Sequence, residues 1–318
     1  MKILITTPSG EIGRRVLHEL LAPEFSVRVI EHDPGGPPQE FREEVEIVGG
    51  ATDDLGTWRR SLDGVEALFC CVPGEPFHET DVRGHYERFA RACCQAIREA
   101  RTPRVVTLSA VGKGLANDPG PISGLLAMEE ILDESGTAIR HLRCGSFMEN
   151  ILAQARSIAA RGVFSFPVPG HVPISLVAAT DIADVVLRWL VRRDWNGIED
   201  IGVYGPEDLS FEQAASVMEQ ILKQPVQYKE APANQYVQSL FSKVANAEYA
   251  QSRSQLFVPL ARGARSEKAG TTKTITPTMF ATWVERELRP WTGSAGLPSG
   301  GSAAPLSCAA ACSGGQPC

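Results

Sequence analysis

The residues best suited to chemistry lie near the amino terminus, in the run Thr-Thr-Pro-Ser-Gly-Glu-Ile-Gly at residues 6–13. This run lies between an apolar stretch, residues 2–6, and a helical pattern of apolar side chains over residues 11–21. A helix that begins here presents unpaired backbone amides and the positive end of its dipole, which together attract a diphosphate. Gly10 lets the backbone approach the phosphates, and Gly13 lets the helix pack close to the strand. The run therefore predicts a dinucleotide-binding turn.

The turn departs from the usual glycine-rich motif in two places. Thr7 stands where the motif has its first glycine, and Pro8 supplies no backbone amide. The position between a strand and a helix favours cofactor binding. The two departures leave open a scaffold that keeps the turn and has lost its ligand.

An acidic residue follows the second predicted strand, where the adenosine ribose would lie. Glu31 can accept hydrogen bonds from both ribose hydroxyls and would repel the 2′-phosphate of NADP. We therefore expect NAD(P)H as the cofactor, with NAD(H) favoured over NADP(H). His32, Arg14 or Arg15 could still hold a 2′-phosphate.

Two later strand ends would border the same cofactor. Val72 and Pro73 end the fourth predicted strand, where the dinucleotide would cross the edge of the sheet. Ser109 ends the fifth strand beside the expected nicotinamide, where it could donate a hydrogen bond to a substrate carbonyl or satisfy local backbone. The chain contains no Tyr-x-x-x-Lys sequence, so this proton-transfer pair is absent. His78, His85 or water could supply the proton instead.

The elements that must position these residues alternate between strand and helix from residue 2 to residue 142. The apolar runs predict strands at residues 2–6, 26–30, 45–48, 67–72, 104–108 and 138–142. The periodic segments between them predict helices at residues 11–21, 54–62, 86–99 and 125–134. This alternation predicts an α/β fold with a doubly wound parallel sheet of the Rossmann type.

The pattern loosens after Gly145, which suggests a second part of the chain. We expect a dinucleotide-binding Rossmann domain over residues 1–145 and a smaller C-terminal substrate lobe, interleaved with the sheet, over residues 146–291. The segment 292–318 is rich in Gly, Ser, Ala and Pro, a composition typical of a disordered tail.

Three helices are expected beyond Gly145. One covers residues 178–192, and another runs to residue 222 from a capping box formed by Ser210 and Gln213. The last would begin with Thr276 as its N-cap and Pro277 at its first position, and would end at residue 288.

Composition narrows the classes of partner. The 318-residue chain is 43% hydrophobic with a net charge of −7, so a nucleic-acid partner gains no electrostatic attraction. No apolar stretch approaches the roughly 18–20 residues of a membrane span, and no secretory signal is recognisable, so we expect a cytoplasmic protein without a membrane partner. Cys308, Cys312 and Cys318 lack the ligand spacing of a zinc site, so we expect no metal.

The chain resembles the NmrA-like family of atypical short-chain dehydrogenases/reductases from residue 2 to about residue 291. The segment Leu-Arg-Cys-Gly-Ser-Phe-Met-Glu-Asn is the most diagnostic, with Cys144 where proline is usual. The resemblance implies that Phe147, Met148 and Asn150 shape a substrate pocket near the nicotinamide. The segments that carry the resemblance are residues 7–13, 105–112, 142–150, 181–184 and 204–210.

The resemblance implies two classes of function. One is an NAD(P)H-dependent oxidoreductase that passes a hydride to a small organic acceptor such as a quinone, an imine or a specialised metabolite. The other is a non-catalytic NAD(P)-sensing regulator that acts through a protein partner. In either case we expect the dinucleotide to contact Thr7, Ser9, Gly10, Glu11, Ile12, Gly13, Glu31, His32, Val72, Pro73, Ser109 and Phe147.

Overall fold

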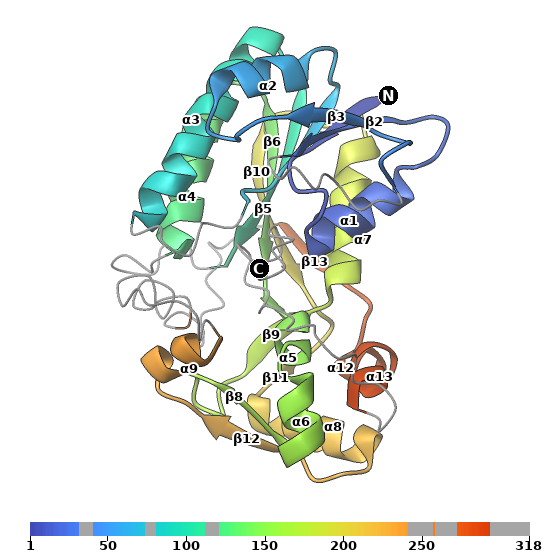
Figure 1. Cartoon of the computed structure of the whole chain (residues 1–318), viewed down its shortest axis with the longest axis vertical. Helices are drawn as coiled ribbons and strands as arrows, with labels where there is room; N and C mark the ends of the chain where they lie inside the picture. Colours follow the sequence, from blue (N-terminus) through green and yellow to red (C-terminus); the bar gives the residue numbers. More distant parts are fainter. Residues whose placement is uncertain (32–40, 74–80, 112–120, 241–256, 258–271, 293–318) are drawn as a thin grey trace.

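The computed structural model describes residues 1–31, 41–73, 81–111, 121–240, 257 and 272–292. His32, His78 and the expected tail from residue 293 lie outside these described residues. The described chain forms a layered α/β part and a smaller lobe below it (Figure 1).

An eight-stranded sheet forms the centre of the α/β part, with every strand parallel to its neighbours. The strand order is β13-β10-β6-β5-β4-β1-β2-β3, so the order reverses between β1 and β4, as in a doubly wound dinucleotide-binding sheet. The strands are β1 (Lys2–Ile5), β2 (Ser26–Glu31), β3 (Glu46–Gly49), β4 (Ala67–Cys70), β5 (Arg104–Ala110), β6 (Ala138–Cys144), β10 (Ile198–Tyr204) and β13 (Thr272–Ile275).

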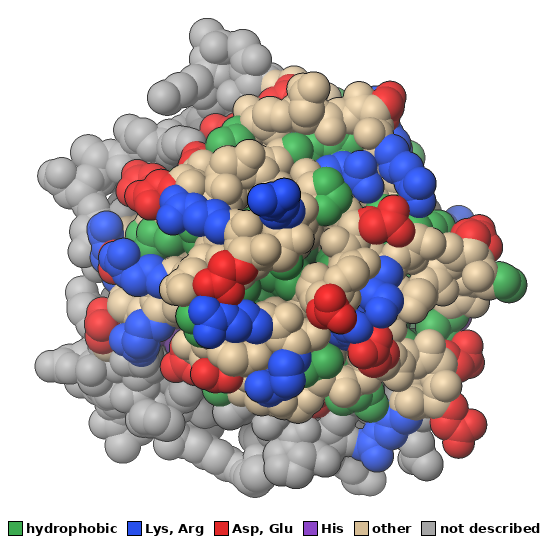
Figure 2. Space-filling view, turned by 90° about the horizontal axis from the view of Figure 1, so that it is seen from above, with side chains coloured by type: hydrophobic (Ala, Val, Ile, Leu, Met, Phe, Trp, Pro, Cys, Tyr) green, Lys and Arg blue, Asp and Glu red, His purple; other side chains and the backbone are tan. Residues whose placement is uncertain are grey.

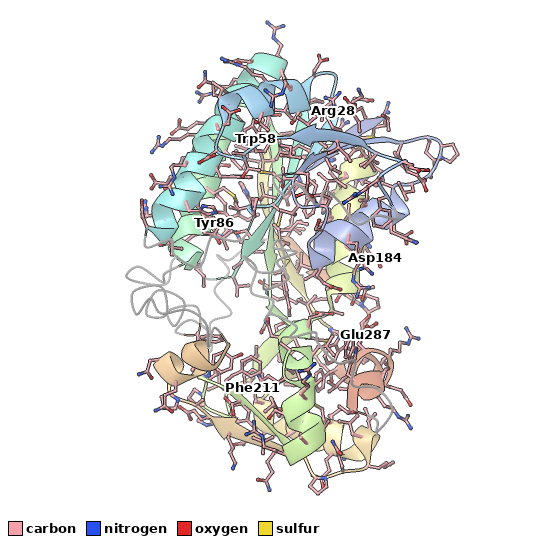
Figure 3. All side chains as sticks on the ribbon, viewed as in Figure 1. Arg28, Trp58, Tyr86, Asp184, Phe211 and Glu287 are labelled. Atoms are coloured by element: carbon pink, nitrogen blue, oxygen red, sulfur yellow. The ribbon has the colours of Figure 1, made fainter. Side chains whose placement is uncertain are left out.

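Helices cover both faces of this sheet, which explains why the central strands β1, β4, β5 and β6 are almost wholly buried. Helices α2, α3 and α4 lie on one face, and α1 and α7 lie on the other (Figure 1). Trp58 and Tyr86 are fully buried on the first face (Figure 3). The helices are α1 (Glu11–Glu19), α2 (Leu55–Leu62), α3 (Val82–Ala100), α4 (Pro121–Asp133) and α7 (Ala179–Val191).

The lobe lies beyond the carboxyl ends of the sheet strands (Figure 1). Its core contains a cluster of aromatic rings, in which Phe211 stacks on Phe166 with 4.6 Å between ring centroids. Its strands are β7 (Ser146–Phe147), β8 (Val163–Phe166), β9 (Ile174–Val177), β11 (Asp208–Leu209) and β12 (Gln227–Glu230). Its helices are α5 (Glu149–Leu152), α6 (Ala155–Arg161), α8 (Phe211–Leu222), α9 (Ala233–Leu240), α12 (Phe280–Trp283), the π-helical η2 (Val284–Leu288) and α13 (Arg289–Thr292).

The predicted Rossmann-type α/β class is confirmed, and each of the six predicted strands is present. The capping box before α8 is also confirmed. The Ser210 hydroxyl accepts from the Gln213 amide at 3.2 Å, and the Gln213 side chain accepts from the Ser210 amide at 2.9 Å. The prediction missed β10 and β13, which extend the sheet from the second half of the chain.

The predicted start of the last helix is wrong. Helix α12 begins at Phe280 rather than after Thr276, because tertiary hydrogen bonds hold the preceding residues in an extended path. Asp181 accepts from the amide and the hydroxyl of Thr278 at 2.9 and 2.7 Å. The Glu207 carboxylate accepts from the Phe280 amide at 2.9 Å and so caps the helix from a distant part of the chain.

Candidate functional site

The turn between β1 and α1 is built around a close backbone approach. A Cβ atom at Gly13 would lie 1.8 Å from the carbonyl oxygen of Thr7, so only glycine fits there. Gly10 is the N-cap residue of α1 and provides no side-chain cap, and its own amide donates to the Thr7 carbonyl at 3.2 Å. The first-turn amides of α1, including those of Glu11 and Ile12, therefore lack a side-chain partner and can bind an anion.

Thr7 contributes a second polar group at this turn. Its side chain is only 5% exposed, and its Oγ1 atom is buried without a hydrogen-bond partner among the described residues. A buried hydroxyl without a partner is unfavourable, and a phosphate oxygen in the turn would provide one. The turn thus fits the diphosphate of a dinucleotide, even though Thr7 replaces a glycine.

The end of β2 lies beside the same turn. The Ser9 hydroxyl donates to Glu31 Oε2 at 3.4 Å, so the structure brings together two residues that are 22 positions apart. Arg15 forms an ion pair with Glu11 at 2.7 Å, which leaves it already engaged. Arg14 is exposed.

Thr6 fixes the place where the strand order reverses. Its hydroxyl donates to the Cys71 carbonyl at 2.6 Å and accepts from the Cys71 amide at 2.9 Å, which ties the end of β1 to the end of β4. Sequence reasoning missed this role, although a threonine at the end of an apolar strand was the available signal. Of the next two residues, Val72 is buried and the carbonyl of Pro73 accepts from Nε2 of His85 at 3.1 Å.

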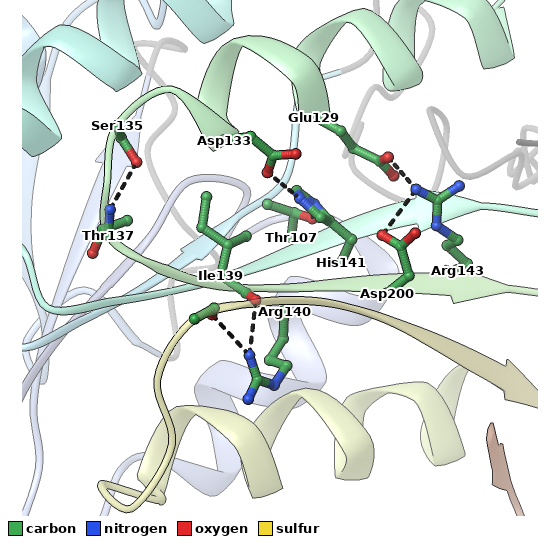
Figure 4. Close-up of polar contacts among 11 residues, drawn as sticks. Thr107, Glu129, Asp133, Ser135, Thr137, Ile139, Arg140, His141, Arg143 and Asp200 are labelled. Atoms are coloured by element: carbon green, nitrogen blue, oxygen red, sulfur yellow. Dashed lines mark hydrogen bonds and ion pairs between the residues drawn. The ribbon is translucent and has the colours of Figure 1, made fainter. Parts of the chain in front are cut away.

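Ser109 lies in a row of residues that face α3 and α4. It is fully buried on β5 and is in register with Arg143 on β6. The Arg143 guanidinium contacts the Glu129 carboxylate and bonds Asp200 at 3.0 Å (Figure 4). Arg143 Nε and Nη1 have no hydrogen-bond partner among the described residues. Sequence reasoning missed this ion cluster directly beside Ser109.

A second polar chain lies one step further from the strand ends. The Thr107 hydroxyl donates to His141 Nδ1 at 2.8 Å, and His141 Nε2 donates to Asp133 at 2.9 Å (Figure 4). This order matches a Ser-His-Asp triad, but Thr107 and His141 are both fully buried. Thr107 lies two residues before Ser109, inside the sheet and away from the carboxyl end of β5, so we assign the chain of bonds a structural role, joining β5, β6 and α4.

The residues after β6 lie at the junction of sheet and lobe. Phe147 is 2% exposed and packs in the core under α1 and α7, whereas Met148 is fully buried in the core of the lobe. Asn150 is half-buried on α5. The structure therefore places these three expected pocket residues in different surroundings.

Glu149 is a further buried carboxyl that sequence reasoning missed. It is 3% exposed, and its Oε1 accepts from the Ala179 amide at 3.0 Å and from Trp283 Nε1 at 3.1 Å. Its Oε2 has no partner among the described residues. Burial, with a smaller contribution from the nearby Glu11 carboxylate, raises the pKa of Glu149 to about 7. Glu149 thus joins the start of α7 to the last helical segment.

We also searched the part of the chain that the structure describes for a metal site, a membrane-spanning helix and a charged surface patch. No group of three or more His, Cys, Asp or Glu side chains there could hold a metal ion. None of its helices has both the length and the apolar run needed to cross a bilayer. On the face seen from above, basic and acidic side chains are interspersed (Figure 2).

Comparisons with known proteins agree with this geometry. Residues 1–258 match the model of the NmrA-like family. An NAD(P)H azoreductase from Xenophilus azovorans is 24% identical over 256 residues, which cover 80% of this chain and 86% of the relative. A (4-alkanoyl-5-oxo-2,5-dihydrofuran-3-yl)methyl phosphate reductase from Streptomyces griseus is 26% identical over 277 residues, 87% of this chain and 91% of the relative.

A solved structure shares the fold. The NADPH-dependent quinone oxidoreductase QOR2 from Escherichia coli, in complex with NADPH, superposes with a TM-score of 0.72 and 20% identity. The match covers 89% of this chain and 98% of QOR2. The fold of this chain is therefore that of a known NADPH-binding protein.

Proposed function

The chain belongs to the NmrA-like family, and from this premise we propose that it is an NAD(P)H-dependent reductase of a small organic acceptor. The main support for this proposal is the start of α1, which has no side-chain cap. There Gly13 lies against the Thr7 carbonyl, and the first-turn amides have no side-chain partner and can bind an anion. The two curated relatives are both named as reductases, which supports the same class of reaction.

In this proposal the first turn of α1 holds the diphosphate. The amides of Glu11, Ile12 and Gly13 and the hydroxyl of Thr7 donate hydrogen bonds to its oxygens. The bound cofactor supplies a hydride from its nicotinamide ring. Glu31, oriented by Ser9 at 3.4 Å, accepts from the hydroxyls of the adenosine ribose.

The ribose contact leads us to propose that NAD(H) is favoured over NADP(H). A carboxylate at Glu31 repels a 2′-phosphate. Arg15 is held by Glu11 at 2.7 Å, which removes one cation that would offset this repulsion. QOR2 binds NADPH, so the proposed preference distinguishes this chain from that structural neighbour.

For the acceptor we propose a quinone, an imine or a related specialised metabolite. Such electron-poor compounds need little acid catalysis, which suits a chain without a Tyr-x-x-x-Lys sequence. Ser109 would polarise an acceptor atom, and Phe147 and Asn150 would border the nicotinamide.

The proposal is tested by mixing the protein with NADH or NADPH and a panel of quinones and azo dyes. Oxidation of the reduced cofactor is followed by its absorbance, and cofactor binding is measured separately by calorimetry. Turnover of at least one acceptor supports the reductase. Failure of both reduced cofactors to bind would contradict it.

One observation favours a second function, the NAD(P)-sensing regulator. Ser109 is fully buried, and the sequence offers no tyrosine–lysine pair to replace it. A regulator would bind the cofactor with the same turn and transmit its redox state to a protein partner. Tight cofactor binding without turnover of any acceptor in the panel would select this function.

A further inference from the structure

A cavity of about 200 Å³ lies next to the strand ends that carry the candidate site. It is formed by the ends of β10 and β13 on one side and by β9 and the start of β11 on the other. Pockets for drug-sized ligands are larger, about 300–1,000 Å³, so this volume suits one or two fused rings. Val111, Gly145 and Ser146 line it on the side towards β5.

The sheet register places this cavity on the face that carries Ser109. Ser109 is in register with Arg143, Arg143 with Gly202, and Gly202 with Lys273. Registered residues of parallel neighbours lie on one face, and so do residues two apart on a strand. Tyr204, two residues after Gly202, therefore lies on the same face as Ser109, and Lys273 and Tyr204 both line the cavity.

Two glycines allow the lobe to pack closely against these strand ends. A Cβ atom at Gly145 would lie 2.6 Å from the Ser175 carbonyl oxygen, and one at Gly205 would lie 1.9 Å from the Leu176 carbonyl oxygen. Both carbonyls belong to β9. The backbone of β9 thus packs directly on the ends of β6 and β10, and the cavity remains beside that contact.

Two of the residues that line the cavity have buried hydroxyls without hydrogen-bond partners among the described residues. Tyr204 is 9% exposed, and neither its hydroxyl nor that of Ser175 has a partner among the described residues. Both residues line the same cavity. Buried hydroxyls without partners are unfavourable, and a ligand oxygen that accepts from them would remove the penalty.

Charged residues of both signs line the cavity. Lys273 lies on one wall, and Glu207 and Asp208 lie on another. Glu207 already accepts from the Phe280 amide at the start of α12, where the helix dipole offsets its charge. Lys273 and Asp208 contribute one charge of each sign to the lining, which favours an uncharged ligand over a phosphate or a carboxylate.

We propose that this cavity binds the part of the acceptor that lies away from the nicotinamide, and that the acceptor is a flat, uncharged ring with carbonyl oxygens. Tyr204 and Ser175 donate hydrogen bonds to those oxygens and select a quinone or a similar cyclic carbonyl compound. This inference rests on the proposed reductase function and defines its substrate class.

The test measures binding without turnover. The full chain is saturated with the oxidised cofactor, and 2,3-dimethyl-1,4-naphthoquinone, whose ring positions are blocked against thiol addition, is titrated by calorimetry. Tyr204→Phe keeps the ring and removes the donor, so its Kd for the quinone should rise about fivefold to tenfold. Ser175→Leu fills the cavity and should raise the Kd more than tenfold. Ile198→Val, at the far end of β10, is the control and should bind as the parent does.

The outcomes separate the two proposals. Quinone affinity within twofold of the parent in both variants would overturn the cavity assignment, as would a parent that binds the cofactor but no quinone. A parent that binds neither oxidised nor reduced cofactor would instead overturn the reductase function. If Ser175→Leu fails to fold by circular dichroism, Tyr204→Phe alone decides, because it changes a single hydroxyl.

Discussion

The carbonyl oxygen of Thr7 fills the space beside Gly13, so that a Cβ atom on Gly13 would lie 1.8 Å from it. The neighbour is backbone, which cannot move aside without displacing either β1 or α1. The close approach therefore fixes where the amides at the start of α1 point, and these amides are what we expect to hold the diphosphate.

Replacing Gly13 with alanine should abolish cofactor binding. The added methyl group pushes the start of α1 away from β1, so the open amides no longer converge on the diphosphate. We expect at least a hundredfold loss of NAD(P)H affinity by calorimetry. Gly49→Ala is the matched control, because a Cβ atom at Gly49 meets nothing within 4 Å. Unchanged affinity in Gly13→Ala would show that the cofactor binds elsewhere.

Replacing Glu31 with serine should change the choice of cofactor. The variant loses the carboxylate that accepts from the ribose and repels a 2′-phosphate. The ratio of NADH to NADPH affinity should fall about tenfold or more, measured by titration of both cofactors. Glu43→Ser removes an exposed carboxylate and should leave the ratio unchanged. A constant ratio in Glu31→Ser would mean that Glu31 does not contact the ribose.

Ser109→Ala should slow turnover more than it weakens cofactor binding. Ser109 is fully buried at the end of β5, where its hydroxyl would polarise an acceptor atom. We expect kcat to fall about tenfold to a hundredfold, with the Kd for the cofactor changed less than threefold. Exposed Ser26, at the start of β2, provides a control through Ser26→Ala. An unchanged kcat would assign Ser109 a purely structural role.

Glu149→Gln should remove a pH dependence of stability. The pKa of Glu149 is raised to about 7 in the fold, against 4.5 for an ordinary glutamate, because the carboxyl is buried. The native protein therefore loses stability as the pH rises from about 4.5 to 7, since the unfolded chain ionises first. Glutamine stays neutral and keeps an oxygen for the Ala179 amide and Trp283 Nε1.

The stability that Glu149→Gln gains over the parent should depend on pH. The free energy of unfolding of Glu149→Gln minus that of the parent should be about 3 kcal/mol larger at pH 8 than at pH 5. Urea unfolding at the two pH values measures this difference, with Glu43→Gln as the exposed control. The same stability difference between variant and parent at both pH values would show that Glu149 is ionised in the fold throughout.

The sheet could be predicted from the sequence because its strands are short apolar runs bounded by turn residues. Ala67–Cys70 is buried at every position, and such a run is typical of a parallel strand covered on both faces. Ser210 and Gln213 form their predicted capping box because that motif depends on residues three apart. The sequence pattern was sufficient to predict an element where the residues that stabilise that element lie within it or next to it in the sequence.

The predictions failed where the partner is distant in sequence. Thr276 looked like an N-cap, but Glu207 and Asp181 determine where the last helix begins. Arg143 and Glu149 gave no local sign of being buried, since their partners lie on other elements. The expected pocket residues followed from a resemblance, and the cavity we identify depends instead on register between β10 and β13.

A crystal structure of the protein soaked with NADH would show directly where the dinucleotide binds. We predict density for the diphosphate at the start of α1, within hydrogen-bonding distance of the Ile12 and Gly13 amides, with the adenosine ribose at Glu31. A dinucleotide bound at any other place on the molecule, or a saturating soak that leaves this turn empty, would show that the start of α1 is not the cofactor site.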